Sequence, residues 1–251
     1  MPLVVGNWKM NPKSLGEAKE LFVKIRKEID VVDNVRIVIA PPSVFISDLG
    51  RLSPSGRMAI AAQAIYPIPS GPYTGEISIP MVISTGVDFV LIGHSERRSR
   101  GIDDDGVCSR LKSAWKEKVT PIVCVGESTR DGAGDYFSVV ESQIQHAFRN
   151  ATKSQVKKTV IAYEPVWAIG TGCNATADDV HEMRLYIEKC LTKLYDRSTA
   201  GLVCILYGGS VNVGNVENLY KDGNVDGFLV GGASLNADNF SNIIKRVSNL
   251  I

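Results

Sequence analysis

Eight short runs rich in valine and isoleucine recur along the chain at intervals of roughly 30 residues, the usual length of a strand-plus-helix unit. The runs are Leu3–Trp8, Val35–Ala40, Met58–Gln63, Phe89–Ile92, Pro121–Val125, Thr159–Tyr163, Val203–Leu206 and Gly227–Val230. Most of them lack alternating polar residues, which is typical of parallel strands that are buried on both faces. This repeated order therefore predicts an α/β fold with a parallel sheet.

Amphipathic helical patterns lie between the runs. In one, apolar residues step by three and four through Leu15, Ala18, Phe22, Ile25 and Ile29. In another they step through Val180, Met183, Ile187, Cys190 and Leu194. This spacing places the apolar side chains on one face of a helix. Two pairs, Ser14 with Glu17 and Thr176 with Asp179, predict capping boxes that begin these two helices.

The repeat uses the whole chain of 251 residues without a linker or a shift in composition. We therefore expect one domain, residues 1–251. A sheet of eight parallel strands can close on itself and so lose both edges, and about 250 residues is the usual size of such a (β/α)8 barrel. A doubly wound open sheet is the rival architecture, and the barrel is favoured. In either fold, binding and catalysis belong at the carboxyl ends of the strands.

Composition excludes several classes of partner. The formal net charge is +1, from 28 basic and 27 acidic residues, so no strong field attracts nucleic acid or a membrane surface. No apolar run approaches the ~20 residues that span a bilayer, and no basic segment precedes the first apolar run as in a signal peptide. The five cysteines are an odd number without Cys-x-x-Cys spacing, which indicates a reducing compartment. We expect a cytoplasmic protein.

Polar residues follow several of the predicted strands, so they converge on one rim. Asn7 and Lys9 come at the end of the first run, and His94 follows the fourth. Glu164 follows the sixth run and is a candidate general base, with Pro165 biasing its backbone towards an extended conformation. His94 directly precedes a predicted helix start, where the helix dipole disfavours its cationic form. Singly, such residues are more often structural. Their convergence indicates an active site.

Two glycine-rich turns follow the last two runs, at Gly208-Gly209-Ser210 and Gly231-Gly232. Without Cβ atoms, their backbone N–H groups can approach a bound anion, and the loops after the last two strands of such barrels commonly bind phosphate. A third turn, Gly170-Thr171-Gly172, offers a further amide from the side. Lys9 is the one full positive charge that we expect inside.

Five motifs stand in order along the chain: Asn7-Trp8-Lys9, GHSERR (residues 93–98), AYEPVWAIGTG (162–172), YGGSV (207–211) and VDGFLVGGAS (225–234). In order and spacing, over essentially the whole chain, they resemble the triosephosphate isomerase family. The resemblance implies a TIM barrel that interconverts dihydroxyacetone phosphate and D-glyceraldehyde 3-phosphate through an enediolate, with no cofactor and no metal.

The resemblance also implies a role for each matched residue. Glu164 would be the base that moves the proton, and His94 the neutral electrophile that polarises the carbonyl group. Lys9 would stabilise negative charge, Asn7 would hydrogen-bond near the reacting oxygens, and Glu96 would pair with Lys9. The backbone amides that would hold the phosphate are those of Gly170, Ser210, Gly231 and Gly232.

Two loops take on functions by the same resemblance. Pro165-Val166-Trp167 would be a rigid hinge and Ala168–Thr171 the tip of a lid. The segment Ala64–Glu76 is too long for an ordinary connection in a compact domain. Its residues Tyr73, Thr74, Gly75 and Glu76 match the part that reaches a second subunit near that subunit's Lys9, so a homodimer is implied.

The chain departs from the family pattern in two stretches and in a slightly short loop, Ser128 to Gly134. Ser99–Asp105 replaces an aromatic-Gly-Glu stretch and puts three acids where we expect a helix to begin, a position at which negative charge is tolerated. Cys173-Asn174-Ala175 replaces a Lys-Thr-Ala hinge.

Three rival interpretations compete with the isomerase. An NAD-dependent oxidoreductase would use the G-x-G-x-x-A match that begins at Gly170, but Glu164–Ile169 separates that turn from its strand. A serine hydrolase would use Ser95, but Arg97 stands where a nucleophile elbow has its last glycine. A non-enzymatic barrel would not explain the polar residues at the rim. A P-loop is excluded, because the chain has no Gly-Lys dipeptide.

Overall fold

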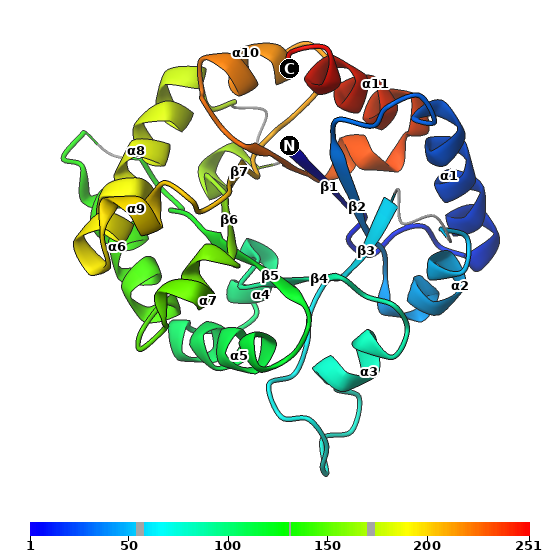
Figure 1. The fold of residues 1–251 in the computed structure, drawn as a ribbon, viewed down its shortest axis with the longest axis horizontal. Coiled ribbons are helices and arrows are strands. Elements are labelled where there is room, and N and C mark those ends of the chain that lie inside the picture. Colours follow the sequence, from blue (N-terminus) through cyan, green and yellow to red (C-terminus); the bar gives the residue numbers. More distant parts are fainter. Residues whose placement is uncertain (54–57, 131, 170–173) are drawn as a thin grey trace.

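The computed structural model describes residues 1–53, 58–130, 132–169 and 174–251. Eight parallel strands form a closed barrel in which each strand pairs with the next along the chain and β8 pairs with β1 (Figure 1). The strands are β1 Leu3–Asn7, β2 Arg36–Ala40, β3 Met58–Ala62, β4 Phe89–Ile92, β5 Thr120–Val125, β6 Val160–Tyr163, β7 Ile205–Tyr207 and β8 Gly227–Val230. The predicted barrel is confirmed, and the open sheet is wrong.

The predicted strands all form, with boundaries that differ by at most two residues. The largest difference is at β7, which begins at Ile205 rather than Val203. The side chains of each strand alternate between two apolar clusters, as the period of two requires. Leu3 and Val5 belong to a cluster made of strand residues alone, which fills the barrel, whereas Val4 belongs to the larger cluster shared with the helices.

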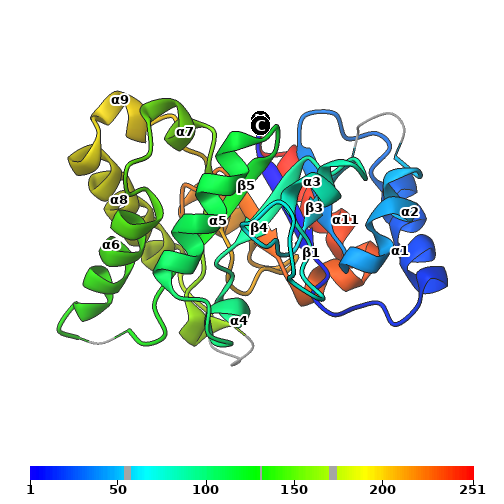
Figure 2. The ribbon, with the colours of Figure 1, turned by 90° about the horizontal axis from the view of Figure 1, so that it is seen from below.

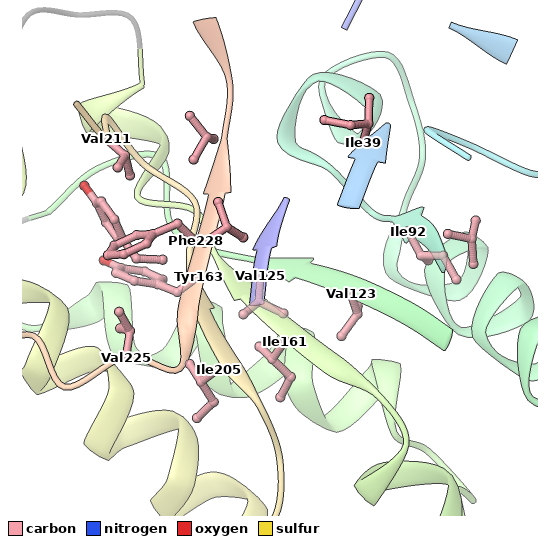
Figure 3. Packing of buried hydrophobic residues seen from close by; sticks show 14 of the residues in the cluster. Ile39, Ile92, Val123, Val125, Ile161, Tyr163, Ile205, Val211, Val225 and Phe228 are labelled. Carbon is pink, nitrogen blue, oxygen red and sulfur yellow. The ribbon is translucent and has the colours of Figure 1, made fainter. Parts of the chain in front are cut away.

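The larger of these two clusters lies between the outer face of the barrel and the helices. Val123 on β5, Ile161 on β6 and Ile205 on β7 are register partners, and Figure 3 shows their side chains close together on this face. Because every strand is covered on both faces, its backbone positions are held tightly. The barrel therefore provides a rigid base for the residues that follow each strand.

Helices surround the barrel, and Figure 2 shows them on both sides of it. They are α1 Leu15–Glu28, α2 Ile46–Gly50, α3 Ile79–Ile83, α4 Ser95–Arg98, α5 Asp104–Lys116, α6 Asp135–Ala147, α7 Lys153–Lys157, α8 Ala177–Leu194, α9 Arg197–Ala200, α10 Val216–Lys221 and α11 Ala237–Ser248. Three 3-10 turns are η1 Ser43–Phe45, η2 Val166–Ala168 and η3 Gly232–Leu235. The α4 helix, which follows β4, lies at the end of the barrel opposite α7 and α9 (Figure 2).

One of the two predicted capping boxes forms completely. At α8, Thr176 accepts from the Asp179 N–H, and the Asp179 carboxylate accepts from the Thr176 N–H. At α1, Ser14 accepts from the Glu17 N–H at 3.2 Å, but the Glu17 carboxylate accepts from Lys13 instead of Ser14. The prediction of a reciprocal box at Ser14 is wrong, because the longer glutamate side chain reaches one residue further back.

The segment between β3 and α3 projects away from the barrel (Figure 1, cyan). Its base is closed by a hydrogen bond from Tyr66 N to Ile77 O of 2.8 Å. The rings of Tyr66 and Tyr73 stack at a tilt with centroids 4.6 Å apart. Residues 68–76 are all exposed in the single chain.

Within the described ranges, no helix combines the length and apolarity needed to cross a membrane.

Candidate active site

The polar residues that follow the strands surround one cavity of about 270 Å³ at the carboxyl end of the barrel. Of the predicted site residues, those that line this cavity are Asn7, Lys9, His94, Glu164, Ser210, Gly231 and Gly232. Glu96 does not line it, and Gly170 lies outside the described residues. Apolar neighbours such as Ile169 and Leu229 complete the wall. A cavity with few polar groups on mostly apolar surroundings is the usual form of a small-molecule site.

Glu164 comes directly after β6, and only 2% of it is exposed. Its backbone N–H donates to Val125 O at 2.8 Å, which ties it to the end of β5. Its Oε2 accepts from the Ser95 N–H at 2.8 Å. Its Oε1 lies 3.2 Å from His94 Nε2, without the angles of a hydrogen bond. The carboxylate therefore keeps one oxygen able to accept a proton, which is what a general base requires.

His94 is the N-cap residue of α4, as the sequence predicted. Its Nδ1 accepts from the Glu96 N–H at 3.2 Å, so Nδ1 carries no proton. In a neutral imidazole the proton then resides on Nε2, the nitrogen that faces Glu164. His94 can therefore donate a hydrogen bond from Nε2 to a substrate oxygen while staying uncharged.

Lys9 has a left-handed backbone, with φ of 53°. This unusual conformation is held from both sides, since the Lys9 N–H donates to Asn7 Oδ1 at 3.1 Å and Lys9 O accepts from Gln63 Nε2 at 2.8 Å. The Lys9 ammonium lies 2.7 Å from Glu96 Oε1. Burial raises the pKa of Glu96, but the hydrogen bond and charge of Lys9 outweigh it, so the pKa is below its usual value. Glu96 faces a neighbouring cavity.

The glycine-rich turns lie close to the polar side chains, and at Gly208 the approach leaves no room for a Cβ. A Cβ on Gly208 would lie 2.9 Å from Glu164 Cγ, and one on Gly231 would lie 3.5 Å from Lys9 Cε. The η3 turn begins at Gly232, next to Lys9. An anion on the backbone of Gly231 and Gly232 would therefore lie beside the lysine charge.

Two further residues shape the site and were not singled out as site residues from the sequence. Glu127 is buried, and its Oε1 accepts from Tyr163 OH at 2.9 Å and from Trp167 Nε1 at 2.7 Å. Burial, and then the charge of Glu127, raise the pKa of Tyr163. Gln63 joins the carbonyl groups of Lys9 and Ala40. The only available sequence signal was their place directly after predicted strands or at the last residue of one.

The altered stretch Ser99–Asp105 takes the position that the sequence indicated. Asp103 is the N-cap of α5 and accepts from the Gly106 N–H at 2.7 Å. Asp104 pairs with Arg98 at 2.6 Å. The acids thus lie at a helix N-terminus, where they are favourable. The other altered stretch is described only from Asn174 onward, and Cys173 lies outside the described residues.

The described part of the chain contains no group of three or more His, Cys, Asp or Glu side chains that could together bind a metal ion. The G-x-G-x-x-A match of the rival NAD-dependent interpretation, residues 170–175, falls mainly outside the described residues. The observed polar groups are a carboxylate, an imidazole, an ammonium and two glycine-rich turns. Together with the closed (β/α)8 barrel, they define an enzyme for a small anionic substrate that acts by proton transfer.

Comparison with known proteins identifies the family. Residues 2–247 match the family model described as triosephosphate isomerase. The chain is 42% identical to the triosephosphate isomerase of Endomicrobium trichonymphae over 246 residues, covering 97% of this chain and 98% of the relative. It is 40% identical to the triosephosphate isomerases of Finegoldia magna and Porphyromonas gingivalis, each with 97% of this chain and 98% of the relative covered. The chain belongs to the triosephosphate isomerase family, which decides between the rival interpretations in favour of the isomerase.

Proposed function

We propose that Glu164 and His94 together catalyse the reaction of this family in the cavity at the barrel's carboxyl end. The chain is an aldose–ketose isomerase that interconverts dihydroxyacetone phosphate and D-glyceraldehyde 3-phosphate. The observation that supports the assignment is the 3.2 Å approach of His94 Nε2 to Glu164 Oε1 in this buried cavity, beside Lys9. A base and a hydrogen-bond donor at this separation can act on neighbouring atoms of one small substrate.

In the proposed mechanism, Glu164 removes a proton from the carbon next to the substrate carbonyl group. The electron pair of that C–H bond forms the C=C bond of an enediolate, and the carbonyl oxygen becomes negatively charged. His94 donates its Nε2–H towards that oxygen, and Lys9 supplies the nearby positive charge. Glu164 then returns the proton to the former carbonyl carbon, and the hydroxyl proton on the first carbon passes to the former carbonyl oxygen, so that the first carbon becomes the new carbonyl group. Triosephosphate isomerase is itself the established example of a glutamate base paired with a neutral histidine.

The substrate phosphate is proposed to bind where the last two strands end. Ser210, Gly231 and Gly232 line the cavity at the side opposite β4, and Lys9 lies next to Gly231. Backbone amides and one ammonium group are a common combination for binding phosphate. The same role for Gly170, and the lid at Ala168–Thr171, remain predictions because residues 170–173 lie outside the described part. Asn7, which is buried, would hydrogen-bond near the reacting oxygens.

A homodimer is the proposed assembly, formed through the projecting segment that contains Tyr73, Thr74, Gly75 and Glu76. These residues are exposed in the single chain. Met10 is 91% and Val44 76% exposed, and Met10 borders the cavity that also contains Glu96 and Lys9. Large apolar side chains around a cavity are typical of a surface that binds a partner. A second copy's projecting segment would cover them and stabilise the loop that carries Lys9.

Residues 1–251 are proposed to form one domain, because the barrel closes only when β8 pairs with β1. If the chain is one domain, we expect it to unfold in one cooperative transition. We also propose a cytoplasmic location, because the four cysteines in the described ranges are free thiols, which persist in reducing compartments.

The decisive experiment is an isomerase assay with purified protein, a metal chelator and no added nucleotide. We expect the wild type to convert glyceraldehyde 3-phosphate under these conditions. Glu164→Asp retracts the carboxylate by about 1 Å, and a misplacement of that size can cost about 10²-fold in rate. We therefore expect kcat to fall by about 10²-fold with little change in KM. The exposed Glu117→Asp is the matched control and should leave both constants unchanged.

An inactive wild type would refute the proposed reaction. A Glu164→Asp variant with the kcat of the wild type would instead leave the reaction in place and refute the assignment of Glu164 as the base.

A further inference from the structure

Gln143 on α6 forms two hydrogen bonds with a single residue at the end of β5. Its Oε1 accepts from the Gly126 N–H at 2.7 Å, and its Nε2 donates to Gly126 O at 3.0 Å. The side chain is buried, and its helix neighbours Val140 and Ile144 belong to the outer core. Because both ends of the amide are used, the orientation of the Gly126 backbone is set by a side chain from the helix layer.

Gly126 in turn touches the backbone of Glu164. A Cβ on Gly126 would lie 1.9 Å from Glu164 O, so only the absence of a side chain allows the contact. The residues on either side of Gly126 hold the same segment, since Val125 O accepts from the Glu164 N–H and Glu127 O accepts from the Val166 N–H. A shift of Gly126 would therefore shift the backbone that carries the carboxylate.

Glu164 also borders a second cavity, on the side of Gln143. This cavity of about 260 Å³ is lined by Gln143, Gly126 and Glu164, with Val139 and Val166 among its other walls. Among the described residues, Glu164 alone lines both this cavity and the substrate cavity. The position of the carboxylate thus depends on the Ser95 N–H that binds its Oε2 and on the backbone beneath it, which Gly126 contacts.

We propose that Gln143 is a positioning residue for the reaction: it sets the location of the Glu164 carboxylate through the Gly126 backbone and does not touch the substrate. The proposal rests on the proposed function of Glu164 as the base. Gln143 lies outside the substrate cavity, 17 residues after Gly126 in the sequence. In the part of the chain that the structure describes, the turns that follow β7 and β8 receive no hydrogen bond from the Gln143 side chain, whose two bonds both go to Gly126.

The test is to replace the amide and measure chemistry and anion binding separately. Gln143→Leu keeps a similar shape and removes both hydrogen bonds. We expect kcat to fall about 10- to 100-fold, because small displacements of a catalytic group cost that much. We expect KM and the inhibition constant of inorganic phosphate to stay within about twofold of the wild type. Both constants report the phosphate contacts, which bind substrate and transition state alike and which the substitution leaves in place.

Two further variants complete the design. Gln145→Leu changes an exposed glutamine on the same helix and should alter neither constant. Gln143→Asn keeps the amide but is one methylene too short to reach Gly126, and it should lower kcat less than Gln143→Leu does. If Gln143→Leu does not fold, Gln143→Asn is judged by the same two measurements.

A Gln143 variant with the kcat of the wild type would overturn the proposal. So would a parallel loss of kcat and phosphate inhibition, because that pattern reports a general distortion of the rim. If the wild type is active and Glu164→Asp is impaired while the Gln143 variants are normal, only the positioning role fails. An inactive wild type would refute the proposed function itself.

Discussion

Removing the ammonium group of Lys9 should weaken the binding of simple anions. Lys9 Nζ lies 3.9 Å from the position of a Cβ on Gly231, where the backbone is proposed to hold the phosphate. At about 4 Å, two unit charges attract each other by about 4 kcal/mol at an effective dielectric constant near 20. The lysine is thus close enough to contribute substantially to phosphate affinity.

The net contribution is smaller than this attraction. Glu96 Oε1 is only 2.7 Å from the same ammonium group and offsets part of its charge, and 29% of the Lys9 side chain remains exposed to water. A hydrogen bond to a charged group contributes about 1.5–3 kcal/mol after the exchange with water. At about 1.4 kcal/mol per factor of ten, Lys9→Ala should raise the inhibition constant of phosphate by about 10- to 100-fold.

The assay is competitive inhibition of the isomerase by inorganic phosphate and, separately, by sulfate. Lys19→Ala is the matched control, because it removes the same formal charge from a lysine that pairs with Asp48 on the outer helices. The control should leave inhibition unchanged at constant ionic strength. An unchanged inhibition constant in Lys9→Ala would refute the reasoning and would show that the anion binds away from Lys9.

Two further predictions concern assembly and thiol chemistry. Thr74→Arg should shift the protein towards monomer in sedimentation velocity and lower kcat in parallel, because an unpaired charge in a desolvated interface costs several kcal/mol; a fully dimeric variant, or a fully active monomer, would contradict it. In a Cys173→Ser background, thiol labelling at pH 8 should be slow, because burial raises the pKa of Cys190 to about 11 and that of Cys204 to about 12. Folding favours these neutral thiols, so their contribution to stability is complete below the ordinary pKa of 9.0 and is lost as the pH rises through about 11 to 12. Rapid labelling of Cys190 or Cys204 at pH 8, identified by peptide mapping, would argue against this.

The local signals in the sequence predicted most of the barrel. The continuous apolar run Phe89–Ile92 became a strand with the predicted bounds. A strand that is buried on both faces is apolar at every position, so its two ends are visible in the sequence. The predicted start of β7 was two residues too early, because Val203 and Cys204 are apolar but precede the residues that pair with β6. The cap at Ser14 showed the same limit, because a motif does not reveal how far the Glu17 side chain reaches.

The candidate site was predicted by type and by place along the chain. Asn7, Lys9, His94 and Glu164 do meet in one cavity, because parallel strands in a barrel all end at the same rim. Glu96 was placed with them, and it does pair with Lys9, but it faces a neighbouring cavity. The direction from which Glu96 approaches Lys9 depends on the orientation of the short helix α4, and the spacing of residues in the sequence does not specify that orientation.

The sequence by itself determined the order of strands and helices and the residue types at the rim, because these follow from patterns within a few neighbouring residues. The tertiary structure alone decided which groups hold the segments of the rim in place. Gln63 reaches Lys9 across 54 residues, Trp167 reaches Glu127 across 40, and Gln143 reaches Gly126 across 17. Such contacts form only when closure of the barrel brings separate strand ends to within hydrogen-bonding distance. A hydrogen bond depends on a few tenths of an ångström and on angle, and this geometry is a property of the packed fold.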